Sequence, residues 1–350
     1  MPKIIDLIKP QILGEYYADK TVNDSPFLGE ALFPAKKKAG LDLSFIKGAN
    51  ESQVLLKPSR FDSLAELRER IGIETIQTEM PLFREGMQIK EREAQEIMKF
   101  SNATMQNPYL RSAVEKVYDD VNGLISSARK VPERMRMELL STGKISISSV
   151  KGDKGTAYNY DYTDTNFNTN NMETLTGNAL WSAPATATPF SDLRRWKETM
   201  EDRGVEVNTA IMTRKTFTYI VKSKEIKDMF TNLMVVTEKN VREFLIAELG
   251  LDIIIYNKTY VDYDNSSKKY YPDDKVTLIP SGDLGNTYYG TTNEEAQLNS
   301  GVNQNVSVVD TGVAILSTVE PHPVNEKVYV AEIVLPSFER MSQIFIATVG

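Results

Sequence analysis

The sequence predicts an α+β protein built from more than one packed region. The chain has 350 residues, which exceeds the size at which a single hydrophobic core usually stops growing. A long amphipathic helix is predicted over residues 107–142, and residues 191–300 alternate helical stripes with apolar strands, a pattern typical of a compact α/β region. Two packed regions with different secondary structure therefore have to coexist in one chain.

The first 88 residues contain few apolar side chains between many chain breakers. Pro10, Gly14, Pro26 and Pro34 interrupt residues 1–44, so this segment is predicted to be an extended N-terminal arm. Residues 45–88 mix charges with a few alternating apolar side chains. We expect a two-stranded flap in which residues 71–75 pair with a return strand at residues 87–90. Such a ribbon is marginally stable unless something covers it.

The clearest local signal is that of the long helix. Asn107 is a favourable N-cap, and Pro108 suits the first helical position. Pro132 is expected to kink or split the helix, and Gly143 is expected to end it. Apolar residues recur at spacings of three and four along one face: Leu110, Val114, Val117, Val121, Leu124, Ile125 and Ala128.

Residues after the long helix predict strands and polar loops. Lys144–Ser148 and Tyr158–Tyr162 alternate as strands do, and the intervening residues are rich in Asn, Asp, Thr and Gly. Together with the helix they make up a region over residues 89–190.

The compact α/β region is predicted from helix caps and apolar runs. Ser191 is expected to cap a helix carrying Leu193, Trp196 and Met200 on one stripe. Thr213 and Thr237 are expected to cap two further helices. Ile253–Tyr256 follows Gly250 directly and is expected to form a buried central strand.

Three strand candidates remain at the C-terminal end, within residues 301–350. They lie at residues 306–316, 327–335 and 343–349. They need a sheet to join, and we expect all three to complete the region that contains the long helix.

The residue types needed for common active sites are missing or isolated. The chain has no cysteine and one histidine, His322, which excludes thiol nucleophiles, sulfur-ligated zinc and His-rich metal sites. Asp161 with Asp164, or Glu201 with Asp202, resembles an acid/base pair only by proximity. Asp262–Ser266 superficially resembles a calcium loop, but Ser267 stands where that loop requires glycine, and a hairpin tip is favoured. No catalytic residue, metal or cofactor is predicted.

Charge and hydropathy restrict the partners. Residues 1–150 carry 22 Lys and Arg against 21 Asp and Glu, whereas residues 151–350 carry 19 against 27. An acidic second half disfavours tight binding of nucleic acid, which depends on Lys and Arg releasing counterions. No apolar run approaches the length of a membrane span, and no signal segment is recognised at the start.

Four short segments carry a resemblance that covers nearly the full length. They are Leu139–Ser146 at the end of the long helix, Ala179–Ser182, Tyr271–Pro280 and the closing Pro336–Glu339. With the order of arm, flap, long helix, α/β insertion and returning strands, the chain resembles the major capsid proteins of tailed bacteriophages. It is most similar to the lambda-like major capsid protein E family, which has the Hong Kong ninety-seven type of fold.

The resemblance implies a domain organisation and a set of partners. Residues 1–44 would be the N-terminal arm, 45–88 the extended loop, 89–190 the peripheral domain with its spine helix at 107–142, 191–300 the axial domain, and 301–350 the return strands of the peripheral domain. The chain would assemble with itself as pentamers and hexamers in the virion shell, after assembly in the bacterial cytoplasm. Portal, scaffolding or decoration proteins would be further partners, contact with packaged double-stranded DNA would be non-specific, and no membrane is involved.

The extended loop supplies the candidate contacts between subunits. Its charges alternate in sign and would pair across the contact, while its isoleucines would supply apolar burial. The candidates are Arg60, Glu66, Arg68, Arg70, Ile71, Ile73, Arg84 and Glu85.

Three other functions stay open from sequence alone. An encapsulin-like shell around protein cargo shares the capsid fold. A two-domain soluble ligand-binding protein would need a convergent polar pocket, which is not visible. A tail-tube protein is disfavoured by the long helix.

Overall fold

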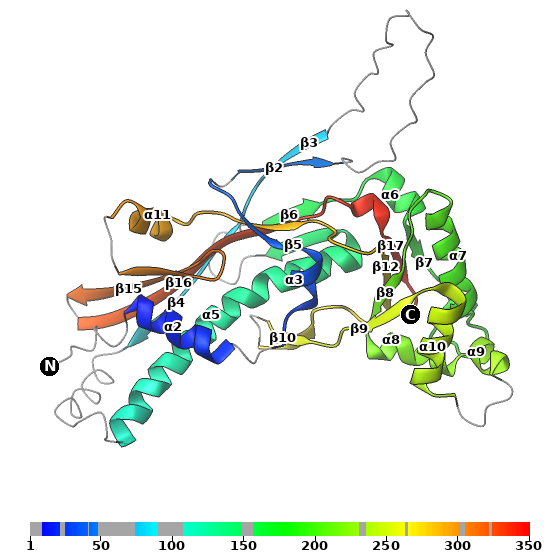
Figure 1. Ribbon diagram of the computed structural model, residues 1–350, viewed down its shortest axis with the longest axis horizontal. Helices are drawn as coiled ribbons and strands as arrows, with labels where there is room; N and C mark the ends of the chain where they lie inside the picture. Colours follow the sequence, from blue (N-terminus) through cyan, green and yellow to red (C-terminus); the bar gives the residue numbers. More distant parts are fainter. Residues whose placement is uncertain are drawn as a thin grey trace, which may run out of the picture. The chain divides into compact units, whose positions relative to one another are not determined.

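The computed structural model describes residues 9–21, 25–40, 42–47, 74–89, 108–148, 157–230, 236–262, 265–301, 305–321 and 324–350. The chain divides into two compact units (Figure 1). The first unit comprises Met1–Leu43, Gln77–Arg134 and Asn286–Ser337. The second comprises Ser44–Ile76, Met135–Gly285 and Phe338–Gly350. Each unit thus collects segments that are far apart in the sequence.

The first unit is organised by a six-stranded sheet. Its strand order is β1-β13-β16-β15-β14, and β4 also pairs with β16. All pairs are antiparallel except β1 with β13. The strands are β1 (Ala35–Lys37), β4 (Leu82–Ile89), β13 (Asn286–Tyr289), β14 (Val306–Val309), β15 (Val313–Pro321) and β16 (Val324–Ser337).

Helices cover one face of this sheet. Side chains of β16 such as Val328 and Val330 form one buried cluster with Ile125 of α5 (Pro108–Thr142) and with Leu13 and Tyr17 of α2 (Pro10–Thr21). Two short helices, α3 (Leu28–Leu32) and α11 (Asn293–Asn299), belong to the same unit. The prediction of an extended arm is wrong for the described residues, because Pro10 occupies the first helical position, where proline is tolerated.

Helix α5 (Pro108–Thr142) begins and ends where the sequence predicts. Gly143 follows with φ of +73°, which suits glycine at a helix end. The expected split at Pro132 does not occur. Proline costs about 3 kcal/mol inside a helix, but Met135, Met137 and Leu139 are at most 2% exposed, and their burial holds the last turns in place.

The second unit contains a five-stranded sheet of order β7-β17-β12-β8-β9. Its strands are β7 (Met172–Thr174), β8 (Thr209–Met212), β9 (Asp252–Ile255), β12 (Lys275–Ile279) and β17 (Phe345–Thr348). Two predictions fail here. The last strand, β17, joins this sheet and not that of the first unit, and β9 lies at an edge and not at the centre. Ile254 and Ile255 are accordingly only half-buried.

Helix caps in this unit follow local chemistry. The side chains of Thr213 and Thr237 cap α8 (Arg214–Lys222) and α10 (Glu238–Leu249) as predicted. Ser191 does not cap α7 (Pro189–Glu201), whose N-cap is Thr188. The remaining helical elements are α6 (Thr165–Asn170), α9 (Lys224–Met229), η1 (Gly177–Ala179) and η2 (Met341–Gln343).

Three two-stranded ribbons complete the described chain. They are β2 (Asp42–Lys47) with β3 (Glu74–Glu79), β5 (Lys144–Ser148) with β6 (Ala157–Asp161), and β10 (Thr259–Val261) with β11 (Ser267–Lys269). The last ribbon confirms the predicted hairpin tip, with Asn265 at φ +61°. The predicted pairing within the flap is wrong, since β3 pairs with β2 and the return strand β4 pairs with β16. Strand β4 thus finds its backbone partners on the long strand β16 and not in a local hairpin.

Candidate assembly surface

The structure places two of the eight predicted contact residues. Arg84 and Glu85 lie on β4 and are exposed. Arg60, Glu66, Arg68, Arg70, Ile71 and Ile73 lie outside the described residues. Their grouping on one surface therefore stays a prediction.

Arg84 makes an ion pair within its own subunit. Its Nη2 atom lies 2.5 Å from Oε1 of Glu294 in the first turn of α11. The next residue, Glu295, accepts a hydrogen bond of 2.5 Å from Nζ of Lys37 at the end of β1. Lys37 Nζ also donates to the backbone oxygen of Gly290 at 3.0 Å. Strand β1, which precedes the predicted extended loop, and strand β4, at the end of that loop, are thus tied to one short helix.

Sequence reasoning missed this cluster. Thr292-Asn293-Glu294-Glu295 matches the Thr-x-x-Glu spacing of a helix start, and the Thr292 side chain does accept from Glu295 N at 3.2 Å. That signal would have located α11, but it carries no information about Lys37 or Arg84, which are more than 200 residues away.

A second polar cluster fastens the N-terminal helices to α5. Arg129 donates to Tyr17 Oη at 3.2 Å and to Glu30 Oε1 at 3.2 Å, and it lies 3.6 Å from Asp310 Oδ2. Burial opposes the charge, yet the hydrogen bond to Tyr17 and the two carboxylates keep the pKa of Arg129 above its ordinary value. About one turn further along α5, buried Glu133 accepts from Gly29 N at 3.2 Å.

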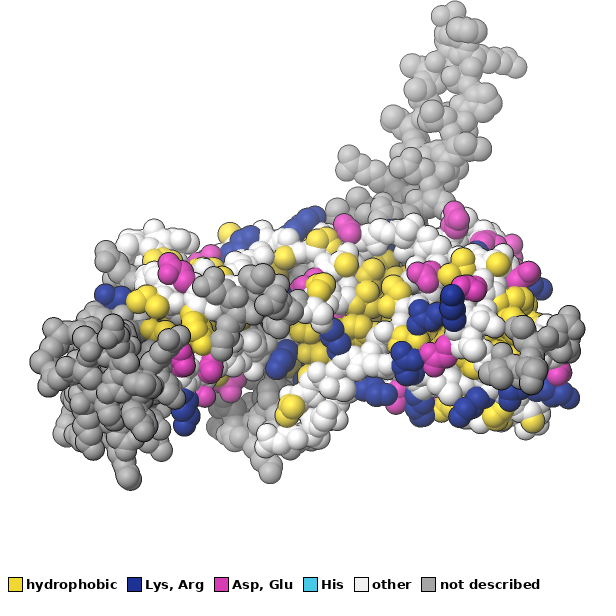
Figure 2. All heavy atoms as spheres, turned by 60° about the horizontal axis from the view of Figure 1, so that its bottom comes forward, with side chains coloured by type: hydrophobic (Ala, Val, Ile, Leu, Met, Phe, Trp, Pro, Cys, Tyr) yellow, Lys and Arg dark blue, Asp and Glu magenta, His cyan; other side chains and the backbone are white. Residues whose placement is uncertain are grey.

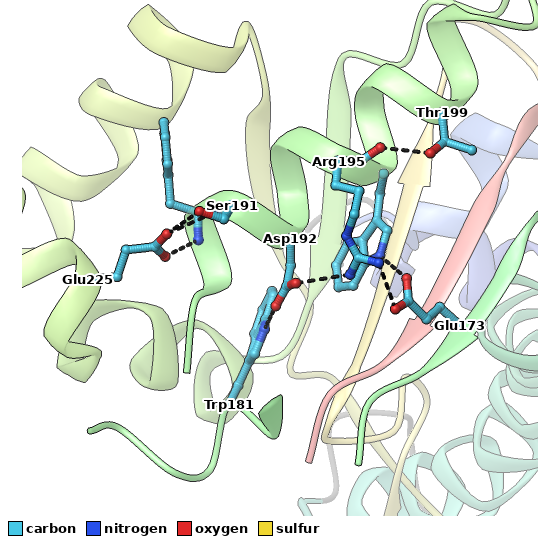
Figure 3. A network of polar contacts seen from close by, with 9 residues as sticks. Glu173, Trp181, Ser191, Asp192, Arg195, Thr199 and Glu225 are labelled. Atoms are coloured by element: carbon cyan, nitrogen blue, oxygen red, sulfur yellow. Dashed lines mark hydrogen bonds and ion pairs between the residues drawn. The ribbon is translucent and has the colours of Figure 1, made fainter. Parts of the chain in front are cut away.

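The second unit holds a polar network around its two tryptophans (Figure 3). The indole N–H of Trp181 donates to Asp192 at 3.0 Å, and that of Trp196 donates to Glu173 at 2.6 Å. Arg195 bridges the two carboxylates at 3.0 and 2.9 Å. Every indole donor is therefore satisfied although both rings are buried, and the network fixes α7 against β7.

The start of α7 is satisfied by a distant carboxylate. Glu225 accepts from Phe190 N at 2.7 Å and from Ser191 N at 3.1 Å, as Figure 3 shows. This explains why the helix begins before Ser191, because the cap comes from α9 and not from the helix's own first residues.

Three of the four carboxylates that resembled acid/base pairs, Asp161, Asp164 and Glu201, have structural partners. Asp164 caps α6 by accepting from Phe167 N at 2.7 Å, and Glu201 lies 3.4 Å from Lys197 Nζ. Although burial acts to raise it, hydrogen bonds from Lys144 and Thr163 hold the pKa of Asp161 below its ordinary value. Among the described residues no group of three or more His, Cys, Asp or Glu side chains could hold a metal ion.

Surface charge in the described part is mixed. On the face shown in Figure 2, Lys and Arg side chains alternate with Asp and Glu. No described helix is long and apolar enough to cross a membrane. His322 lies outside the described residues.

Comparison with solved structures shows the fold. A capsid protein of a prophage of Escherichia coli CFT073 has 15% identity and a TM-score of 0.63, covering 98% of this chain and 99% of its own. A phage-related protein from Bordetella bronchiseptica RB50 has 14% identity and a TM-score of 0.57, covering 96% of each chain. The capsid of cyanophage A-1(L) has 10% identity and a TM-score of 0.50, covering 94% of each chain. The α+β fold predicted from sequence is thus confirmed as that of phage capsid proteins.

Sequence comparison identifies the family. No curated protein matches the chain. The model of the family described as phage major capsid protein E matches residues 17–349, nearly the whole chain. A capsid role is structural, and it places the protein in the shell of the virion. The chain therefore belongs to the phage major capsid protein E family and is a shell-forming capsid protein.

Proposed function

We propose that copies of this chain assemble as pentamers and hexamers into a closed icosahedral shell around packaged double-stranded DNA, without enzymatic activity of their own. Assembly takes place in the cytoplasm of the bacterial host. A portal and scaffolding or decoration proteins are partners in that process, and contact with the packaged DNA is non-specific.

The proposal assigns a role to each part of the chain. Residues 1–44 act as the N-terminal arm, 45–88 as the extended loop and 89–190 as the peripheral domain around the spine helix 107–142. Residues 191–300 form the axial domain, except that β13 and α11 lie in the first unit. Residues 301–350 return to the peripheral domain, except for β17, which joins the sheet of the second unit. The observation that carries the proposal is the family match over residues 17–349. The mixed surface charge in Figure 2 agrees with weak binding of DNA, because a wide basic field would hold it tightly.

Electron microscopy tests the shell directly. Purified protein is expected to form closed particles of uniform size in negative stain. Particles isolated from lysed host cells are expected to contain DNA. A protein that stays monomeric in both preparations contradicts the proposal, and particles filled with a cargo protein favour the encapsulin-like alternative.

Charge reversal tests the extended loop as an intersubunit contact. Replacing Arg68 and Arg70 by Glu is expected to reduce assembly strongly, because the alternating charges would then meet like charges across the contact. The melting temperature of the free subunit should change little, since exposed ion pairs contribute about 0–1 kcal/mol. Particle yield from sedimentation and the melting temperature are measured on the same preparations.

Limited proteolysis provides the control for that experiment. Trypsin should cut the free subunit first between Arg68 and Arg84, and the same bonds should resist in assembled shells. Equal cleavage of these bonds in the two states, or normal assembly of the charge-reversed protein, counts against the intersubunit role of this segment.

A further inference from the structure

Both strands that lead into the extended loop are fixed at one place in the first unit. The chain leaves this unit after Leu43 and re-enters it at Gln77. In the six-stranded sheet, the last strand before this excursion is β1, which ends at Lys37, and the first strand after it is β4, which follows Met80. Between β1 and β4 the two described strands, β2 and β3, pair with each other, and Lys38 N donates to Tyr289 O at 2.8 Å. The two roots of the loop therefore lie at Lys37 and at residues 80–84.

The first root is held by backbone and side chain. β1 runs parallel to β13 from Ala35 opposite Thr287 to Lys37 opposite Tyr289. Beyond this pairing, Lys37 Nζ donates to Gly290 O at 3.0 Å and to Glu295 Oε2 at 2.5 Å. Glu295 is only 12% exposed on its side chain, so this pair is partly shielded from water.

The second root meets the same short segment. Met80 is 2% exposed. A Cβ added at Gly290 would lie 3.1 Å from Met80 Cε and 2.6 Å from Ile333 Cγ2, so only glycine permits this close packing. Four residues after Met80, Arg84 lies 2.5 Å from Glu294, whose side chain is 11% exposed.

Glu294 and Glu295 can reach different strands because they are adjacent on a helix. Successive residues of an α-helix point about 100° apart, so one carboxylate faces β4 while the next faces β1. One tether would leave the loop free to pivot about it. Two ion pairs, one at each root, define both the position and the direction of the base of the extended loop.

We propose that residues 290–295 form a two-point anchor for the extended loop, and that Glu294 and Glu295 are positioning residues for the contact between subunits. The anchor acts by holding Lys37 and Arg84, so that the loop presents its contact residues in one orientation. This inference rests on the proposed function of the loop.

The test replaces both carboxylates by the isosteric amide, as Glu294→Gln with Glu295→Gln. The chain contains no cysteine, so spin labels can be placed cleanly at Thr78→Cys on β3 and Val319→Cys on β15, both in the first unit. In the free subunit the distance distribution between the labels is expected to broaden in the double variant. Particle yield is expected to fall by at least about fivefold, the change that about 1 kcal/mol at a contact produces.

A matched variant separates anchoring from general loss of ion pairs. Glu320→Gln with Glu243→Gln removes two pairs elsewhere, those with Lys327 and Lys239, and should leave both the label distances and the particle yield unchanged. Normal yield with an unchanged distribution in the Glu294 and Glu295 variant overturns the inference, and so does an equal loss in the matched variant. Failure of the unmodified protein to assemble would instead refute the proposed function.

Discussion

Replacing Trp196 by alanine is expected to lower the free energy of unfolding by about 3–5 kcal/mol, the range found when large aromatic side chains are removed from cores. Trp196 is 1% exposed. Its ring stacks between Trp181 at 5.8 Å and Phe345 at 5.6 Å between ring centroids. The substitution therefore opens a cavity between helix α7 and strand β17.

A conservative change at the same position separates the loss of unfolding free energy into a packing part and a hydrogen-bond part. Trp196→Phe keeps most of the apolar area but removes the indole donor to Glu173, and it should lose about 1–2 kcal/mol for the missing hydrogen bond and the smaller ring. Glu173 retains Arg195 as its partner, so the carboxylate is not left uncompensated. Urea unfolding of the free subunit, followed by circular dichroism, measures both variants. Equal losses would show that the hydrogen bond and not the packing supports this core.

Much of the second unit followed from local sequence chemistry. The stripe of Leu193, Trp196 and Met200 is buried as predicted, and the threonine caps of α8 and α10 form as expected. These features depend on residues within one or two helical turns, so a single sequence contains the necessary information. The start of the long helix at Pro108 and its end before Gly143 belong to the same class.

Features set by distant partners could not be predicted in this way. The run at residues 343–349 was correctly identified as strand-forming, but its alternation does not specify a partner. It lies beside β12 and β7 because Asn171 donates to Ser342 O and Ile344 O, at 2.9 and 2.7 Å, which fixes the approach to β17. The α11 anchor could not be predicted for the same reason, since in the sequence Glu294 and Glu295 are ordinary charged residues at a helix start.

Gly143→Ala is expected to lower the free energy of unfolding by about 2–4 kcal/mol, combining a left-handed backbone conformation with overpacking. The residue has φ of +73°, and an added Cβ would lie 2.4 Å from Met341 Cε and 2.5 Å from Thr163 Cγ2. The methionine methyl can move aside at low cost because it ends a flexible side chain. Thr163 is β-branched and stiff, and its hydroxyl is held by Asp161 at 2.6 Å. The backbone around the end of α5 must therefore shift.

Gly204→Ala is the matched control for that substitution. Gly204 has nearly the same φ, +75°, but nothing lies within 4 Å of an added Cβ, so only the conformational cost of about 1–2 kcal/mol remains. Chemical denaturation of the two variants gives the contribution of crowding as their difference. Combining Gly143→Ala with Thr163→Ser, which removes the obstructing methyl and keeps the hydroxyl, should recover part of that difference. If the two alanine variants lose the same stability, contact with Thr163 is not what requires glycine at residue 143, and the end of the long helix is governed by backbone conformation alone.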